Sequence, residues 1–467
     1  MAEANLQMER SPGLLDRPLG DMIAINWEKA GWLLLIAFAV ITRFAALDAR
    51  VISHDESLHT YYSWQLYKGR GFQHTPLMHG PFQFHAVALS YFLFGDNDFT
   101  ARVPSAVFGV AAIALCWYFR RWLGRVGALA AGLLMVISPY MLYYARYVRN
   151  ESFMVVWALL MAIAMFRYFE ARRAIWLYVM VGATAFAYTT KEVTFIYVAL
   201  WMTFLGVLFL RDMFQTEWRR PDLKRYFTYA IYLAAAAIVV VAVFGAFGRQ
   251  MLQGLSPETT VTPADPTAEV EAPEAALSLD PPLAVAGGVA GAALLAAAGL
   301  ALISFRGELR SFASIDLLVI LGTFVLPQLT AAPVDFILQA DALDYSNTGL
   351  LRTVPVFIVL LAVSAGIGLL WDWRKWLISA GIFYGIYIPL YTTVFTNGNG
   401  FATGMVGSLG YWLDQQGVRR GNQPWYYYIA IQTVVYEYLP AIGSLLAAGF
   451  GLQRWLGTKQ SNTDATA

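Results

Sequence analysis

Long apolar stretches alternate with short polar segments along most of this 467-residue chain. Each stretch has about the length, roughly 17 to 25 residues, that carries a helix across the apolar core of a bilayer. The pattern predicts an all-α polytopic membrane protein, a bundle of about twelve transmembrane helices. The predicted spans are residues 31–47, 101–119, 127–145, 152–169, 174–190, 193–210, 226–247, 283–304, 315–332, 354–371, 376–395 and 429–453.

One further apolar stretch, residues 81–94, is rich in aromatic residues but shorter than the others. Its length favours a helix that lies at the membrane interface or re-enters the bilayer over one that crosses it. The stretch belongs to the first external loop, residues 48–100, which we expect to be helical. If residues 81–94 did cross, the two ends of the chain would lie on opposite sides of the membrane.

Composition agrees with this class of protein. Hydrophobic residues make up 58% of the chain and charged residues only 13%, far from the average of a soluble globular domain. The net charge of +1 carries no message about partners. The apolar stretches make the lipid bilayer the expected partner, and no nucleic-acid partner is expected. The single cysteine, Cys116, lies inside a predicted span and excludes an intrachain disulfide.

The distribution of Lys and Arg predicts the orientation, because these residues accumulate in short cytoplasmic loops. With twelve spans and the N-terminus inside, the cytoplasmic segments hold 20 Lys or Arg and the opposite face 11, with Arg43 inside the first span. We therefore expect both termini in the cytoplasm and the first external loop outside the plasma membrane. Residues 1–29 are polar and show no cleavable signal peptide, so the first span is expected to be an uncleaved anchor.

A break in composition divides the chain. Residues 250–282 are rich in Pro, Ala, Thr and Glu and contain no Lys or Arg, which predicts a flexible external linker. The linker separates a cytoplasmic tail, residues 1–30, and a first transmembrane region, residues 31–249, from a second transmembrane region, residues 283–467. The second region includes a Gly-rich external loop, residues 396–428. Glycine at this density either permits tight turns and close approach to a ligand or simply makes the loop flexible.

All five histidines of the chain fall within 32 residues of the first external loop, beside the acidic pair Asp55 and Glu56. Histidine and carboxylate side chains move protons near neutral pH and bind divalent metals, so their concentration here predicts a site. The histidines are His54, His59, His74, His79 and His85.

The acidic pair begins a predicted short helix and has two compatible interpretations. In the structural one, Ser53 caps the helix and Glu56, three residues later, completes a capping box. In the functional one, Asp55 is a general base and Glu56 assists it or holds a metal or substrate. His59 would share a helix face with Asp55.

The other histidines give weaker signals. His74 and His79 lie in a segment with Pro and Gly, which predicts a turn from which both side chains reach either the acidic pair and a substrate or water. No zinc-type spacing is present, but a divalent cation held by Glu56, His59 and His79 is one hypothesis. No cofactor is certain. His85, on the interfacial stretch, is expected to be a packing residue.

Cations on the external face are exceptions to the charge bias. They either contact lipid headgroups or bind an anionic phosphate at membrane depth. Among them, Arg146, Arg149 and Lys191 are the preferred phosphate ligands, and Arg102, Arg419 and Arg420 are candidates for substrate binding. The full set near span ends is Arg102, Arg146, Arg149, Lys191, Arg352, Arg419 and Arg420.

Trp425 begins an aromatic run that ends at residue 428. Aromatic faces pack well on sugar rings, which makes Trp425 a candidate for substrate binding. An aromatic belt at the membrane surface is the favoured alternative.

Several short motifs, in order and spacing, resemble the GT-C glycosyltransferases, which include protein O-mannosyltransferases and the aminoarabinose transferase of lipid A. This resemblance covers about residues 30–210. Within the superfamily, nearly the whole chain is similar to a branch of archaeal and bacterial proteins labelled flippase-activity-associated. The superfamily motifs are the pair Asp55 and Glu56, HTPLMHGP, RVPSAVFG and SPYMLYYARYVRNE; the branch motifs are TNGNG, GSLGYWLDQQGVRRGNQPWYYY and YEYLP.

The resemblance implies an integral membrane enzyme that transfers a sugar, with inversion, from a polyprenyl-phosphate carrier on the non-cytoplasmic face. Asp55 would match the catalytic aspartate, and external cations would neutralise the carrier phosphate. The histidines have no role that the resemblance supplies, and the acceptor, whether protein, lipid or glycan, stays open. The alternative is a translocase or accessory subunit for lipid-linked sugars without transferase activity.

Overall fold

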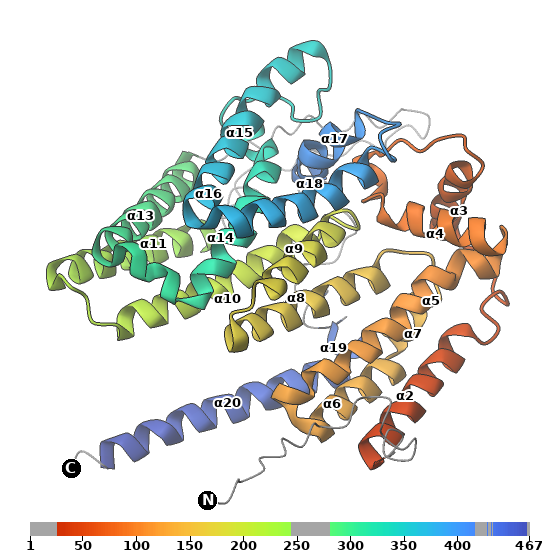
Figure 1. Ribbon diagram of the computed structural model, residues 1–467, viewed down its shortest axis with the longest axis horizontal. Coiled ribbons are helices and arrows are strands. Elements are labelled where there is room, and N and C mark those ends of the chain that lie inside the picture. Colours follow the sequence, from red (N-terminus) through yellow and green to blue (C-terminus); the bar gives the residue numbers. More distant parts are fainter. Residues whose placement is uncertain (1–25, 244–280, 416–426, 428–430, 432, 465–467) are drawn as a thin grey trace, which may run out of the picture. The chain divides into compact units, whose positions relative to one another are not determined.

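The computed structural model describes residues 26–243, 281–415, 427, 431 and 433–464, and these residues form helices and turns without a strand (Figure 1). The linker prediction therefore lies almost wholly outside the described residues, as does most of the predicted N-terminal tail. The all-α prediction is confirmed for the part of the chain that the structure describes. The chain divides into two compact units, each built from segments that are distant in sequence.

The first unit comprises residues 1–51, 102–147 and 426–467. Its core lies between α2, α5 and α6 and contains Trp32, Ala39, Ile113 and Val136. Its helices are α2 (Trp27–Phe44), α5 (Asp98–Leu115, whose first turn belongs to the second unit), η2 (Cys116–Phe119), α6 (Arg120–Ile137), α7 (Pro139–Tyr144), α19 (Thr433–Tyr436) and α20 (Tyr438–Asp464).

The second unit comprises residues 52–101 and 148–425. Its main core lies between α8, α9, α14 and α16, and a smaller core lies between α11 and α13. Its elements are α3 (His54–Tyr67), η1 (Pro76–Met78), α4 (Phe82–Phe94), α8 (Glu151–Ala171), α9 (Ala174–Tyr188), α10 (Thr194–Gln215), α11 (Pro221–Val243), α13 (Pro281–Phe305), η4 (Arg306–Ser311), α14 (Ala313–Val325), η5 (Leu326–Leu329), α15 (Ala331–Phe336), α16 (Asn347–Tyr391), α17 (Gly400–Ala402), the π-helical η6 (Thr403–Gly407) and α18 (Ser408–Gln415).

Each predicted span coincides with helix over most of its described length. Two of the predicted spans form the halves of α16, whose backbone leaves helical geometry at Asp372 (φ −156°, ψ 94°). Within the described residues, six helical stretches are long and apolar enough to cross a membrane, and two of these, of 40 and 45 residues, exceed one crossing. The chain is thus a multi-pass membrane protein, while the count of twelve stays a prediction. The six are Asp98–Ile137, Glu151–Ala171, Thr194–Gln215, Pro221–Val243, Val285–Phe305 and Asn347–Tyr391.

The first external loop is helical, as expected, and contains α3, η1 and α4. The stretch predicted to lie at the interface forms α4, which has 13 residues. At about 1.5 Å per residue, such a helix is about 20 Å long, shorter than the roughly 30 Å apolar core of a bilayer. Its length therefore fits an interfacial or re-entrant position.

Candidate functional site

Glu56 stabilises the start of α3. Ser53 and Glu56 form the predicted capping box, in which one Glu56 carboxylate oxygen accepts the Ser53 backbone N–H (N···O 3.1 Å). The other oxygen accepts the backbone N–H of Val148 (N···O 3.1 Å), and the side chain is fully buried. The capping-box prediction is confirmed. Through Val148, Glu56 also links the first external loop to the segment that precedes α8.

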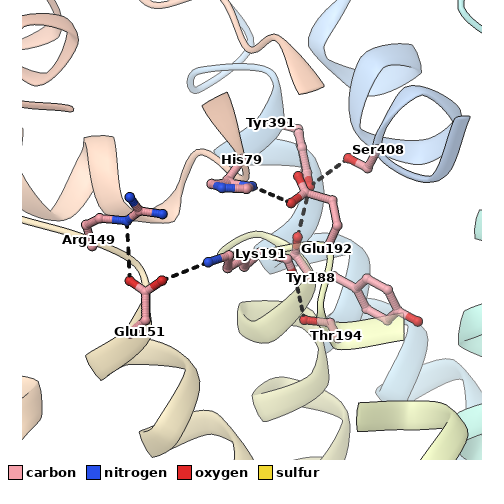
Figure 2. Close-up of polar contacts among 9 residues, drawn as sticks. All are labelled: His79, Arg149, Glu151, Tyr188, Lys191, Glu192, Thr194, Tyr391 and Ser408. Carbon is pink, nitrogen blue, oxygen red and sulfur yellow. Dashed lines mark hydrogen bonds and ion pairs between the residues drawn. The ribbon is translucent and has the colours of Figure 1, made fainter. Parts of the chain in front are cut away.

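Asp55, its neighbour, faces solvent and pairs with a cation. The Asp55 side chain is 51% exposed and forms an ion pair with Arg149. Nε of Arg149 lies 3.6 Å from a Glu151 carboxylate oxygen, and the other Glu151 oxygen accepts from the Lys191 ammonium at 2.8 Å. We call these four residues, Asp55, Arg149, Glu151 and Lys191, the charge row; Figure 2 shows the last three. The row brings together three predicted site residues from three segments of the chain.

The charge row lies where helices begin. Asp55 is in the first turn of α3, Glu151 is the first residue of α8, and Lys191 precedes α10 by three residues. The Lys191 carbonyl accepts both the N–H and the hydroxyl of Thr194, which fixes the turn between α9 and α10 (Figure 2). Unpaired N–H groups and the helix dipole make such N-termini favourable for anions. The surroundings therefore stabilise the two carboxylates and suit a bound anion equally well.

His79 lies against the same turn and pairs with a second carboxylate. Its Nδ1 is 2.7 Å from a Glu192 oxygen (Figure 2). The next residue, Gly80, donates its N–H to the Thr190 carbonyl, and a Cβ at this position would lie only 2.2 Å from the Thr189 carbonyl oxygen. Only glycine allows this close approach of the two backbones. Gly80 thereby sets the distance between His79 and Glu192.

Glu192 is a site residue that the sequence analysis overlooked. Its side chain is 2% exposed, and one of its carboxylate oxygens has no hydrogen-bond partner among the described residues. The signal was present, because an acidic residue directly follows Lys191 in a turn that is predicted to be external, at the end of a predicted span. That His79 reaches it, 113 residues away, is visible only in three dimensions.

His59 and His74 are buried and lie close to the site. Burial, and then the charges of His79 and Arg149, lowers the pKa of His59 to about 4. Burial lowers the pKa of His74 to about 3, and its Nδ1 lies 2.9 Å from the Thr403 hydroxyl. Both rings are therefore neutral near pH 7. His74 as a substrate ligand stays a prediction.

The predicted metal ligands Glu56, His59 and His79 do not form a ligand set. Within the part of the chain that the structure describes, no group of three or more His, Cys, Asp or Glu side chains is placed to hold a metal ion. Both Glu56 oxygens already accept backbone N–H groups. A divalent cation stays a prediction, and these residues do not fit it.

Arg102 and Arg146 belong to the first unit and bind backbone carbonyls at and beyond the end of α2. Arg102 donates to the carbonyls of Leu47, Arg50 and Val51. Arg146 donates to those of Thr42, Arg43, Ala45 and Ala46. Helix C-terminal carbonyls lack intrahelical partners, so these contacts give both arginines a structural task. Three further predicted residues, Arg419, Arg420 and Trp425, lie outside the described residues.

Comparisons with known proteins agree with the resemblance noted in the sequence. Residues 78–248 match the family model described as dolichyl-phosphate-mannose-protein mannosyltransferase. Two curated Mycobacterium tuberculosis proteins, from strains CDC 1551 and H37Rv, are each named polyprenol-phosphate-mannose–protein mannosyltransferase and are 29% identical over 158 residues. The alignment covers 31% of this chain and only 30% of either relative. These matches confirm the resemblance to GT-C glycosyltransferases, and the matched segment contains Arg149, Lys191 and His79.

Solved structures give more distant similarities. The archaeal oligosaccharyltransferase AglB from Archaeoglobus fulgidus, in complex with an inhibitory peptide and a dolichol-phosphate, is 12% identical, with a TM-score of 0.36 over 90% of this chain and 54% of that chain. ArnT from Cupriavidus metallidurans, bound to undecaprenyl phosphate, is 18% identical, with a TM-score of 0.32 over 84% of this chain and 81% of that chain. Neither similarity bears on the activity of this chain.

Proposed function

We propose that this chain is a membrane glycosyltransferase that takes a sugar from a polyprenyl-phosphate donor and transfers it, with inversion, on the non-cytoplasmic face. The observation that carries the proposal is the charge row at the N-termini of helices: the half-exposed carboxylate of Asp55 pairs with Arg149, and Glu151 links Arg149 to Lys191. The match to a mannosyltransferase family, and relatives named for a polyprenol-phosphate-mannose donor, support the choice of substrate class.

Asp55 acts as the general base. Its carboxylate takes the proton of the acceptor hydroxyl while that oxygen attacks the anomeric carbon of the sugar. The bond between the anomeric carbon and the phosphate oxygen breaks on the opposite face, so the configuration inverts and polyprenyl phosphate leaves. A correctly placed base contributes roughly 10² to 10⁴ in rate. Its exposure allows Asp55 to meet an acceptor, whereas buried Glu56 cannot without breaking its backbone contacts.

Arg149 and Lys191 stabilise the leaving phosphate. Each charge-assisted hydrogen bond is worth about 1.5 to 3 kcal/mol, and preorganised donors aimed at developing charge lower the barrier directly. Glu151 keeps both cations in place through its two oxygens. The N-termini of α8 and α10 add further positive potential.

The ion pair between Asp55 and Arg149 couples the two halves of the reaction. Before reaction, the Arg149 charge is shared with the Asp55 carboxylate. When Asp55 accepts the hydroxyl proton it becomes neutral, and the full charge of Arg149 then acts on the phosphate at the moment its negative charge grows. No step in this mechanism passes through a metal ion.

The excess of Lys and Arg in alternate loops supports an active site on the non-cytoplasmic face and both termini in the cytoplasm. Because the match covers less than a third of the curated relatives, the sugar and the acceptor stay open.

The test is sugar transfer by the purified protein, with a panel of radiolabelled polyprenyl-phosphate sugars and membrane extract as the source of acceptor. Asp55→Asn is expected to lose at least about 10²-fold in rate. Asp98→Asn is the matched control, because Asp98 is an exposed carboxylate in the first turn of α5, and it should transfer sugar at the wild-type rate. Equal transfer by wild type and Asp55→Asn would place the base elsewhere. No transfer by the wild type across the panel would favour a translocase or accessory subunit.

A further inference from the structure

His79 and Glu192 form a hydrogen-bonded pair that has no role in the proposed transfer reaction. An ionised carboxylate can only accept hydrogen bonds, so the proton on the 2.7 Å contact belongs to Nδ1 of His79. A carboxylate bound to one ring nitrogen fixes the orientation of the ring and leaves Nε2 as the functional edge. The His79 side chain is 27% exposed, whereas Glu192 is buried. Histidine is therefore the accessible end of the pair.

The backbone is strained to hold this arrangement. His79 has φ +67° and ψ −169°, a backbone conformation that is essentially restricted to glycine. The adjoining Gly80 docks on the turn between α9 and α10 at a distance that excludes any larger side chain. Strain of this kind persists only where the surrounding structure enforces it, and it gathers at functional sites.

The pair adjoins the charge row. Glu192 directly follows Lys191, and the charges of His79, Arg149 and Glu151 all act on the same buried ring, His59. Figure 2 shows His79, Arg149 and Lys191 with the carboxylates that pair with them, Glu192 and Glu151. The two cations of the row are matched by the carboxylates of Asp55 and Glu151, so a phosphate with up to two negative charges would gain from a third donor.

Charge decides what His79 offers to a ligand. A buried carboxylate such as Glu192 needs a cationic partner, because an uncompensated buried charge is costly. Its only hydrogen-bond partner among the described residues is His79. With a phosphate at Nε2 as well, two anions would face the ring, and the imidazolium is the form that can donate to both. In that form Nε2 carries a proton and donates to an anion.

We propose that His79 donates through Nε2 to the phosphate of the carrier lipid, as a third donor beside Arg149 and Lys191, and that Glu192 is a positioning residue that acts only through His79. The proposal rests on the proposed function, since the phosphate is that of the donor.

The experiment measures binding of sugar-free undecaprenyl phosphate to the purified full-length protein, which requires no turnover. His79→Asn keeps an N–H donor toward Glu192 but carries no charge, and, like the histidine it replaces, it is a non-glycine residue at this backbone conformation. Loss of one charge-assisted hydrogen bond predicts about ten- to a hundredfold weaker binding. His79→Gly, which adopts this backbone conformation without strain, is the second variant should the first fail to fold. Two matched controls should bind as wild type: His85→Gln, whose histidine Nδ1 bonds only the Pro81 carbonyl, and Glu28→Gln, a buried carboxylate paired with Arg125.

A double-mutant cycle tests the role of Glu192. Glu192→Gln is expected to weaken undecaprenyl phosphate binding in the wild-type background and to have no further effect in the His79→Asn background. Independent, additive losses would overturn the positioning role. Wild-type affinity of both His79 variants, or a loss confined to the sugar-linked donor, would overturn the phosphate contact. Because binding is measured without transfer, failure here leaves the Asp55 result standing, and failure of transfer leaves the binding result standing.

Discussion

Replacing Glu56 by glutamine separates stability from catalysis within the acidic pair. Each oxygen of the buried carboxylate accepts one backbone N–H, from Ser53 and from Val148. Glutamine offers one acceptor oxygen and one NH₂ donor, so Glu56→Gln leaves one buried N–H facing another donor. An unsatisfied buried group costs about 1–3 kcal/mol. The variant should therefore unfold at a clearly lower temperature than the wild type.

The same change at Asp55 should cost much less stability. Asp55 is half exposed, and an exposed ion pair contributes about 0.2–1 kcal/mol. Thermal unfolding of the detergent-purified variants, followed by tryptophan fluorescence and paired with transfer rates, compares the two. Equal unfolding temperatures for wild type and Glu56→Gln would refute the stabilising role of the Glu56 carboxylate. Loss of transfer by a fully folded Glu56→Gln protein would place Glu56 in the chemistry.

Two further predictions concern the histidine segment. Gly80→Ala forces a Cβ to within 2.2 Å of the Thr189 carbonyl oxygen, and such overpacking costs about 1–3 kcal/mol. The unfolding temperature and the transfer rate should both fall. Gly385→Ala, with open space around it, should behave as wild type. Burial lowers the pKa of His74 from 6.5 to about 3. As pH falls, His74 is therefore protonated at a higher pH in the unfolded chain than in the folded protein. Stability that is fully present above pH 6.5 should therefore decline by about 2 kcal/mol between pH 6.5 and 5. His74→Gln should show a smaller decline in unfolding temperature over that range, and an identical decline would contradict the assignment.

Sequence reasoning succeeded where the determining forces are local. Apolar stretches of span length predicted the helices because burial in lipid and the helical repeat act within one segment. The capping box followed from Ser53 and Glu56, which are three residues apart and satisfy each other's backbone groups. The first external loop was correctly expected to be helical, since α3 and α4 each have their own start and stop signals.

The same reasoning gave no access to contacts between distant segments. The carboxylate of Glu56 also holds Val148, 92 residues away, and His79 reaches Glu192 only because Gly80 docks on a turn that lies between two later helices. Nothing within either segment requires the other. The pairing depends on how α3, α8 and α9 pack together. The pattern of residues within a single segment does not predict this packing.

For the arginines predicted to be external, the type of partner indicates better than the position along the chain which one can bind a phosphate. All three arginines lie near span ends, and the sequence predicts a phosphate ligand at Arg146 as at Arg149 and a substrate-binding residue at Arg102. Arg102 and Arg146 donate to backbone carbonyls at and beyond the end of α2. Moving either one onto a phosphate would leave those carbonyls without donors, and unsatisfied backbone groups are costly. Arg149 is paired with carboxylates. A carboxylate can be replaced by a phosphate oxygen, or neutralised by a proton, without stranding any backbone group, so Arg149 is the arginine that can exchange its partner during a catalytic cycle.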